Sequence, residues 1–185
     1  MDEISKEILT TGVEVVVGKL YDDIVHPTAY IIGQRLKGAI RRLSMKEETI
    51  VEAAQIIEPI MRDVPPEKFV EPEPYIVGSA MLAMTFTLDC EELRNLYANL
   101  LASSMNSDIK DNVHPAFTEI IKQLSPDEAR IMEYISNVGL IPFVHIHTRI
   151  GEKSYRMEYQ YITNIPERVN IQNQKKIPEY IENLV

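Results

Sequence analysis

The chain has 185 residues, enough for one sizeable hydrophobic core or two small ones. Hydrophobic residues make up 45% and charged residues 25%, which excludes general disorder, and a formal net charge of -9 argues against nucleic-acid binding over the whole surface. The sequence contains no apolar run of about 18 residues, so no membrane span is expected. The single cysteine, Cys90, excludes an intramolecular disulfide, and the acidic N-terminus lacks an apolar signal core, so we expect a cytoplasmic location.

The N-terminal part of the chain, residues 1–64, is predicted to form a helical arm. Apolar residues recur at helical spacing in residues 3–25 and again in residues 27–43. Ser44 is followed at capping-box spacing by Glu47, so a third helix is predicted to begin there.

Positive charges gather in the second predicted helix and just beyond it. They are Arg35, Lys37, Arg41, Arg42 and Lys46. No acidic residue interrupts this stretch, although the chain as a whole is acidic. One interpretation is a surface that meets anionic lipid, nucleic acid or an acidic partner. The other, and more common, arrangement is a solvated helix face whose charges pair with acidic neighbours in the fold.

A proline-rich segment follows the arm. Residues 65–74 contain four prolines mixed with Glu67, Glu71 and Glu73, a composition typical of a stiff, extended connector. We therefore predict a domain boundary here, followed by a central helical domain over residues 65–140 that begins with a helix from Tyr75.

The central domain is predicted to be organised around one strongly specified helix in residues 88–105. Asp89 is the expected N-cap, and Glu92 would complete a capping box. Leu88 and Leu93 would form a hydrophobic staple around it. The broad apolar stripe that follows predicts that other helices cover this one.

Two further helices are expected in the central domain. His114 and Pro115 open a short one. The clearest start signal in the chain comes next, because Ser125, Pro126 and Glu128 combine an N-cap serine, a proline at the first position and a glutamate at the third. Gly139 is predicted to end that helix as a C-cap.

Residues 141–185 form the third predicted domain, a β-hairpin and a terminal helix. Residues 143–148 and 155–162 alternate between apolar and polar side chains, with a turn between them. One face of the second strand would carry Tyr155, Met157, Tyr159 and Tyr161. The chain ends on apolar residues without a C-cap signal, so we expect it to end inside an element or to pack on a partner there. The fold class is therefore mainly α, a helical bundle with an N-terminal arm and a small C-terminal hairpin (α+β), whose last part resembles parts of a winged helix.

The sequence contains no persuasive catalytic constellation. His145 and His147 lie two apart and could ligate a metal from one strand face, but no third ligand is near, and two polar side chains on a wet hairpin face are more common. Cys90 has no histidine partner in the sequence and is predicted to be an inert thiol. Gly-rich phosphate loops and nucleophile-elbow motifs are absent. We therefore expect no enzyme activity, cofactor or metal site.

Two stretches of the chain carry a family resemblance. They are Asp89–Met105 and Val113–Ala129, supported by Tyr21-Asp-Asp, Pro27 and Glu71-Pro-Glu-Pro. On these motifs, residues 12–135 resemble the Abi-alpha family, the abortive-infection alpha proteins of bacteria and their mobile elements. The resemblance implies a role in limiting phage propagation by sacrificing or arresting the infected cell, and it supplies no catalytic residues.

Two functional hypotheses follow. The first is a phage-defence protein of the Abi-alpha type that binds a protein partner or a second copy of itself, with peripheral association to an anionic membrane through the basic residues as an overlapping idea. The second is a nucleic-acid-binding or transcription-related module that uses the winged-helix-like part. Nucleic acid is the less favoured partner, because the terminal helix carries Glu179 and Glu182 and no arginine.

Overall fold

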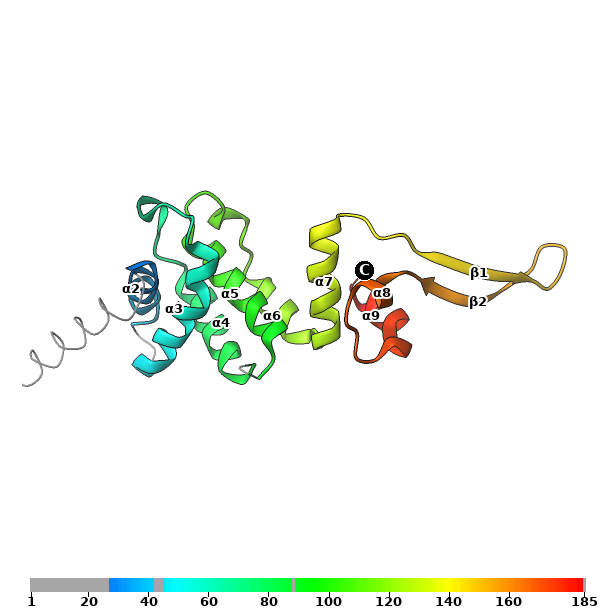
Figure 1. Cartoon of the computed structure of the whole chain (residues 1–185), viewed down its shortest axis with the longest axis horizontal. Helices are drawn as coiled ribbons and strands as arrows, with labels where there is room; N and C mark the ends of the chain where they lie inside the picture. Colours follow the sequence, from blue (N-terminus) through cyan, green and yellow to red (C-terminus); the bar gives the residue numbers. More distant parts are fainter. Residues whose placement is uncertain (1–26, 42–44, 88, 185) are drawn as a thin grey trace, which may run out of the picture. The chain divides into compact units, whose positions relative to one another are not determined.

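The computed structural model describes residues 27–41, 45–87 and 89–184 (Figure 1). The mainly α fold with a small C-terminal hairpin is confirmed. The chain divides into two compact units, unit 1 ending at Ile120 and unit 2 beginning at Ile121. This division does not coincide with the domain boundaries expected after residues 64 and 140. The helix expected in residues 3–25 lies outside the described residues.

Unit 1 is built on four described helices whose apolar faces meet. They are α2 (Pro27–Ile40), α3 (Glu47–Met61), α4 (Pro74–Phe86) and α5 (Glu91–Met105). α5 packs against α3 and α4, and α2 packs against the same two helices. The helical spacing of apolar residues explains the arrangement, because it places Ile32 and Leu36 of α2 and Ile57 of α3 on inward faces, where each is fully buried.

The start of α5 differs from the prediction. Cys90, not Asp89, is in the N-cap position, and no side chain caps the helix. The physical reason is a turn in which the Cys90 N–H donates to the carbonyl of Thr87 at 2.9 Å, which moves the helix start one residue along the chain. Asp89 lies within that turn and is exposed, so the predicted Asp89 cap and its capping box are wrong. Leu88 of the expected staple lies outside the described residues.

The rest of α5 forms the centre of unit 1. Tyr97 and Leu101 are among its largest fully buried side chains, and the Tyr97 hydroxyl donates to the carbonyl of Thr118 at 3.5 Å. Burial raises the pKa of Tyr97, and the nearby negative charge of Glu119 raises it further. The predicted apolar stripe of this helix is therefore confirmed.

The proline-rich segment is only partly an extended connector. It contains the 3-10 helix η1 (Pro66–Lys68), and the Val70 N–H donates to the carbonyl of Met105 at 2.9 Å. Phe69 is buried beside this contact. The backbone on both sides of η1 is extended, as predicted. The segment is nevertheless not a free connector, because the Val70 hydrogen bond and the burial of Phe69 tie it to the core of unit 1.

Two other helix starts in unit 1 can be compared with the sequence. α3 begins at Glu47 with Lys46 as its N-cap, so the predicted Ser44 capping box does not start it, and Ser44 itself lies outside the described residues. The short helix after His114 is confirmed as α6 (Ala116–Gln123), preceded by the 3-10 helix η2 (Lys110–Asn112). The His114 ring explains this start, because its Nδ1 accepts a hydrogen bond from the Ala116 N–H.

Unit 2 packs its helices around a small isoleucine core. Its elements are α7 (Pro126–Val138), β1 (Val144–Arg149), β2 (Tyr155–Ile162), α8 (Ile165–Arg168), the 3-10 helix η3 (Gln174–Lys176) and α9 (Ile177–Leu184). The buried core residues are Ile131, Ile165, Ile171, Ile177 and Ile181. Five buried isoleucines make a small core, so polar contacts matter to this unit.

The predicted start and end of α7 are both confirmed. The Ser125 hydroxyl accepts from the Glu128 N–H at 3.3 Å, and the Glu128 carboxylate accepts from the Ser125 N–H at 2.6 Å, which completes a capping box. Gly139 is the C-cap at φ 77°, a conformation that glycine adopts without a steric cost.

The hairpin is confirmed, but the predicted face of β2 is wrong. Met157 lies opposite His147, whereas Tyr159 lies opposite Ile146. Neighbouring residues on β1 point to opposite faces, so Met157 and Tyr159 also point to opposite faces. The cause is an irregularity in the register between Ile146 and His147, which adds a residue to β2 and reverses the alternation beyond it.

Candidate functional site

The hairpin exposes an unusual amount of apolar surface for so small an element. Every residue of β1 and all but one of β2 are exposed. The large apolar side chains in and beside the hairpin that remain exposed are Phe143, Val144, Ile146, Ile150, Tyr155, Met157, Tyr159 and Ile162. Figure 1 shows the two strands leading away from α7, α8 and α9 to a free turn. Because an isolated two-stranded hairpin is marginally stable in water at best, this surface is a candidate for contact with a partner.

Tyr161 anchors the base of the hairpin to the isoleucine core of unit 2. Its ring packs against the isoleucine core and makes edge-on contacts with Phe143 at 6.0 Å and His145 at 5.0 Å between ring centroids. Tyr161 has a left-handed backbone at φ 54°, which costs a non-glycine residue about 1–2 kcal/mol. The packing of the ring holds this strained residue at the point where β2 meets the core.

Two histidines on β1 were candidate metal ligands. Both are exposed, with His147 opposite Met157 and His145 against the ring of Tyr161. Within the described ranges of the chain, no three histidine, cysteine, aspartate or glutamate side chains are grouped as a metal ion would require. The two histidines are therefore part of the hairpin surface rather than of a coordination site that the structure displays.

The predicted basic cluster is distributed over the end of α2 and the start of α3. Arg35 is half-buried, while Arg41 and Lys46 are exposed. Lys37 forms an ion pair with Glu47 at 2.6 Å. Arg42 lies outside the described residues. Lys37 thus pairs with an acidic neighbour, and the binding of an anionic surface by this cluster stays a prediction.

We expect weak, salt-sensitive association with anionic vesicles if these basic residues meet a membrane, since each basic residue near anionic headgroups contributes about 1 kcal/mol. The test is co-sedimentation of the wild type and of a variant in which four basic residues of the cluster are changed to glutamine: Arg35, Lys37, Arg41 and Arg42. A control variant carries the same change in charge elsewhere, at Lys153, Arg168, Lys175 and Lys176. Equal pelleting of all three proteins, or none by the wild type at low salt, would leave the cluster a structural one.

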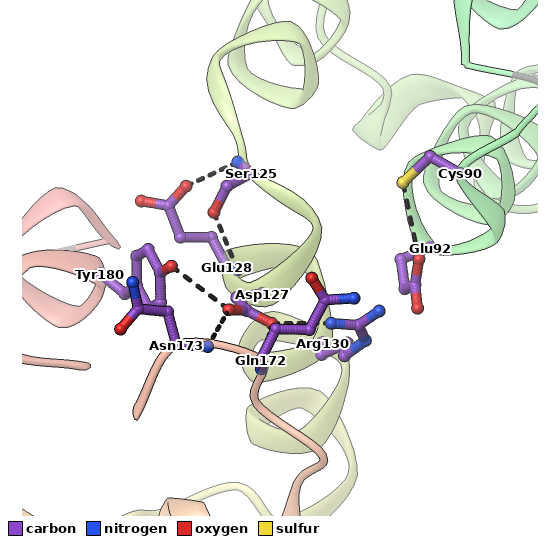
Figure 2. Close-up of polar contacts among 9 residues, drawn as sticks. All are labelled: Cys90, Glu92, Ser125, Asp127, Glu128, Arg130, Gln172, Asn173 and Tyr180. Carbon is purple, nitrogen blue, oxygen red and sulfur yellow. Dashed lines mark hydrogen bonds and ion pairs between the residues drawn. The ribbon is translucent and has the colours of Figure 1, made fainter. Parts of the chain in front are cut away.

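A buried carboxylate holds unit 2 together (Figure 2). Asp127, in the first turn of α7, is 4% exposed. It accepts hydrogen bonds from the backbone N–H of Gln172 at 3.0 Å and of Asn173 at 3.1 Å, from the Tyr180 hydroxyl at 3.2 Å and from the Arg130 guanidinium at 2.7 Å. One side chain therefore connects α7 to the loop before η3 and to α9.

The neighbouring carboxylate strengthens the same junction. Besides closing the capping box, Glu128 accepts a hydrogen bond from the Asn183 side chain at 2.8 Å. From the sequence, Asp127 and Glu128 are accounted for by their position in the first turn of a helix. Their hydrogen-bond partners near the end of the chain were not predicted. No local pattern indicates those partners, because they lie more than 40 residues away.

The electrostatics of Asp127 follow from its contacts. Burial raises the pKa of this carboxyl, but hydrogen bonds from Gln172, Asn173, Tyr180 and Arg130 favour the charged form and together hold the pKa below its ordinary value. Burial and the charge of Asp127 both raise the pKa of Tyr180. The ionised form of Asp127 is therefore the one that unit 2 requires.

This pKa predicts how the stability of unit 2 changes with pH. A carboxyl whose pKa is lower in the folded state contributes stability that is present above its unfolded pKa, about 3.9, and is lost as the pH falls through the folded pKa. We expect Asp127→Asn to destabilise unit 2 at neutral pH, with a difference from the wild type that shrinks below about pH 4. Denaturant melts of both proteins across this range would measure it, and a difference independent of pH would contradict the assignment.

Unit 1 contains a free cysteine, Cys90, and a shallow hollow. The Cys90 thiol is half-buried and donates to the Glu92 carboxylate at 3.5 Å (Figure 2). The hollow, of about 220 Å³, is lined by carboxylates and one lysine: Glu71, Glu73, Asp111 and Lys110, with Tyr75, Ile76, Ser104 and Val113. The partner of the Cys90 thiol is a carboxylate rather than a histidine, and no histidine or cysteine lines the hollow.

Comparisons with known proteins fix the family. The family model described as abortive infection alpha matches residues 41–185, which include all of unit 2 and most of unit 1. No curated protein and no solved structure matches the chain. None of the helices in the described part of the chain is long and apolar enough to cross a membrane. The chain belongs to the abortive infection alpha family.

Proposed function

We propose that this protein limits phage propagation inside an infected bacterial cell by binding a partner, without catalysing a reaction. Membership of the abortive infection alpha family supports the role in phage defence. The observation that supports binding is the hairpin, which presents large apolar side chains on both faces. The proposal places the protein in the cytoplasm and requires no cofactor.

The composition of the hairpin suits protein contact. Aromatic residues and methionine are enriched at protein interfaces, and tyrosine often makes the largest individual contributions there. Tyr155 is 62% exposed and Tyr159 64% exposed, on opposite faces. A partner that covers either face would bury a tyrosine together with neighbouring aliphatic side chains, which is the arrangement expected of a binding surface.

The role in phage defence is tested by expressing the full chain in a phage-sensitive host and scoring both plaques and host survival. We expect fewer plaques than in a host with an empty vector, together with arrest or death of the infected cells. Plaque numbers and survival equal to those of the vector control across a panel of phages would contradict the proposal.

Binding to nucleic acid is the alternative, and the structure offers little support for it. The terminal helix α9 turns Ile177 and Ile181 into the core and leaves Glu179 and Glu182 exposed. We therefore expect no sequence-independent binding to duplex DNA tighter than about 10⁻⁶ M near physiological salt. Fluorescence anisotropy with a labelled duplex measures it, and tighter, salt-sensitive binding would favour the alternative.

A further inference from the structure

The two edges of the hairpin differ in their protection against pairing with another strand. β2 carries Arg156 and Glu158 and the irregularities in its register. Charges and bulges of this kind are the devices by which natural proteins keep an edge strand from adding a neighbour. Residues 144–148 of β1 contain no lysine, acidic residue or proline. β1 is therefore the less protected edge.

The one formally charged residue of β1 does not guard this edge. The Arg149 guanidinium donates through Nε to the carbonyl of Gly151 at 2.9 Å and through Nη2 to the carbonyl of Glu152 at 2.7 Å. These bonds hold the side chain over the hairpin's own turn. An approaching strand would therefore meet no lysine, arginine, aspartate or glutamate side chain along residues 144–148.

The hydrogen bonding of the hairpin shows which backbone groups are left for a second strand. The Ile150 N–H donates to the carbonyl of Ser154 at 3.0 Å, so these two residues form a bonded pair. Bonded and non-bonded pairs alternate along an antiparallel ladder, which makes His147 and Met157 a non-bonded pair. The N–H and C=O of His147 therefore point away from β2. The irregularities between Val144 and His147 add their extra residues to β2, so the alternation along β1 itself continues and the groups of His145 point the same way as those of His147.

The sequence of β1 is self-complementary about Ile146. In an antiparallel pairing of two copies centred there, Ile146 faces Ile146, His145 faces His147, and Val144 faces Thr148. The outward-pointing groups of the two histidines then meet in bonded pairs. A pairing of the two copies centred on His147 would place His145 of one copy opposite Arg149 of the other. A pairing centred on His145 would need residues before Val144, where the strand begins.

We propose that β1 pairs antiparallel with β1 of a second copy, so that two hairpins form one four-stranded sheet. The inference rests on the proposed function in taking the hairpin as the binding surface, and it names a second copy as the partner. Pairing stops at two copies, because the outer strands of that sheet are the two β2 strands with their charges and bulges. The interface is isologous, as closed two-fold assemblies require.

A proline scan of the two edges tests which edge pairs. Proline is tolerated in an edge strand where the N–H faces solvent, and His147 and Met157 are such positions on β1 and β2. Each dimer loses two hydrogen bonds with His147→Pro, so we expect its dissociation constant in sedimentation equilibrium of the full chain to rise at least about tenfold. Met157→Pro is the matched control and should leave the constant unchanged. His147→Lys, which adds a charge without altering the backbone, provides a second variant if the proline disturbs the hairpin.

Covalent capture tests the register. In a Cys90→Ser background, Ile146→Cys places two thiols opposite each other in a non-bonded pair, where the Cα separation of about 4.5 Å is compatible with a disulfide. We expect mild oxidation to link this variant into dimers and to leave Met157→Cys in the same background unlinked. A monomer at all concentrations, or equal cross-linking of both variants, would overturn the proposal. These measurements use purified protein without phage, so this inference and the role in phage defence can fail independently.

Discussion

Replacing Asp127 with alanine is expected to lower the free energy of unfolding of unit 2 by about 3 kcal/mol. The carboxylate is buried and accepts four hydrogen bonds, two of them from backbone N–H groups of Gln172 and Asn173. Its removal leaves these donors without an acceptor in a unit whose isoleucine core is small. Amide hydrogen exchange measures the effect locally, because the Gln172 and Asn173 amides should lose protection first.

Asp89→Ala is the matched control for that experiment. Asp89 was predicted to cap a helix, but it is exposed and α5 has no side-chain cap. We therefore expect this change to alter stability by less than about 0.5 kcal/mol. If the two variants had equal effects, or if Gln172 and Asn173 kept their protection in Asp127→Ala, the buried carboxylate would not be the residue that joins α7 to the C-terminal part of unit 2.

The second large effect is expected in unit 1, where Leu101→Ala should cost about 3 kcal/mol. Leu101 is 0% exposed, in the helix that packs against both α3 and α4. Truncation removes buried methyl groups and leaves a cavity that the surrounding helices can fill only in part. Denaturant melts followed by circular dichroism would measure the change in midpoint and in the slope.

Leu82→Ala makes the same chemical change on an exposed surface of α4. Leu82 is 57% exposed, so we expect a change of less than about 0.5 kcal/mol. Similar losses in the two variants would mean that the packing of α5 is not the main source of stability in unit 1.

Most of the described α-helices, with the exception of the short α8, could be predicted from the sequence because their apolar residues recur at helical spacing. Their first residues were harder to predict. Ser125 and Asp89 show the same capping-box spacing, yet only Ser125 is a cap. Pro126 has a backbone angle suited to the first helical turn and favours a start there, whereas the turn between Thr87 and Cys90 moves the start of α5. That turn depends on a backbone hydrogen bond that spacing does not specify.

Only part of the candidate site could be predicted from the sequence. The alternation of residues 143–148 and 155–162 predicted both strands, but the irregular register that puts Met157 and Tyr159 on opposite faces arises from pairing between strands. The partners of Asp127 were equally hidden, because a contact between residues 45 or more positions apart is set by the packing of α7 with α9. The family resemblance, by contrast, rested on local motifs and is confirmed.

The most direct test of the account is the plating of phage on a host that expresses a Tyr155→Ser, Tyr159→Ser double variant. The two tyrosines occupy opposite faces of the hairpin. Tyr75→Ser is the matched control, since Tyr75 is 56% exposed on α4, outside the hairpin. With equal expression and an unchanged circular dichroism spectrum, we expect the double variant to lose protection and the control to keep it. Full protection by the double variant would contradict the claim that the hairpin is the surface through which this protein acts.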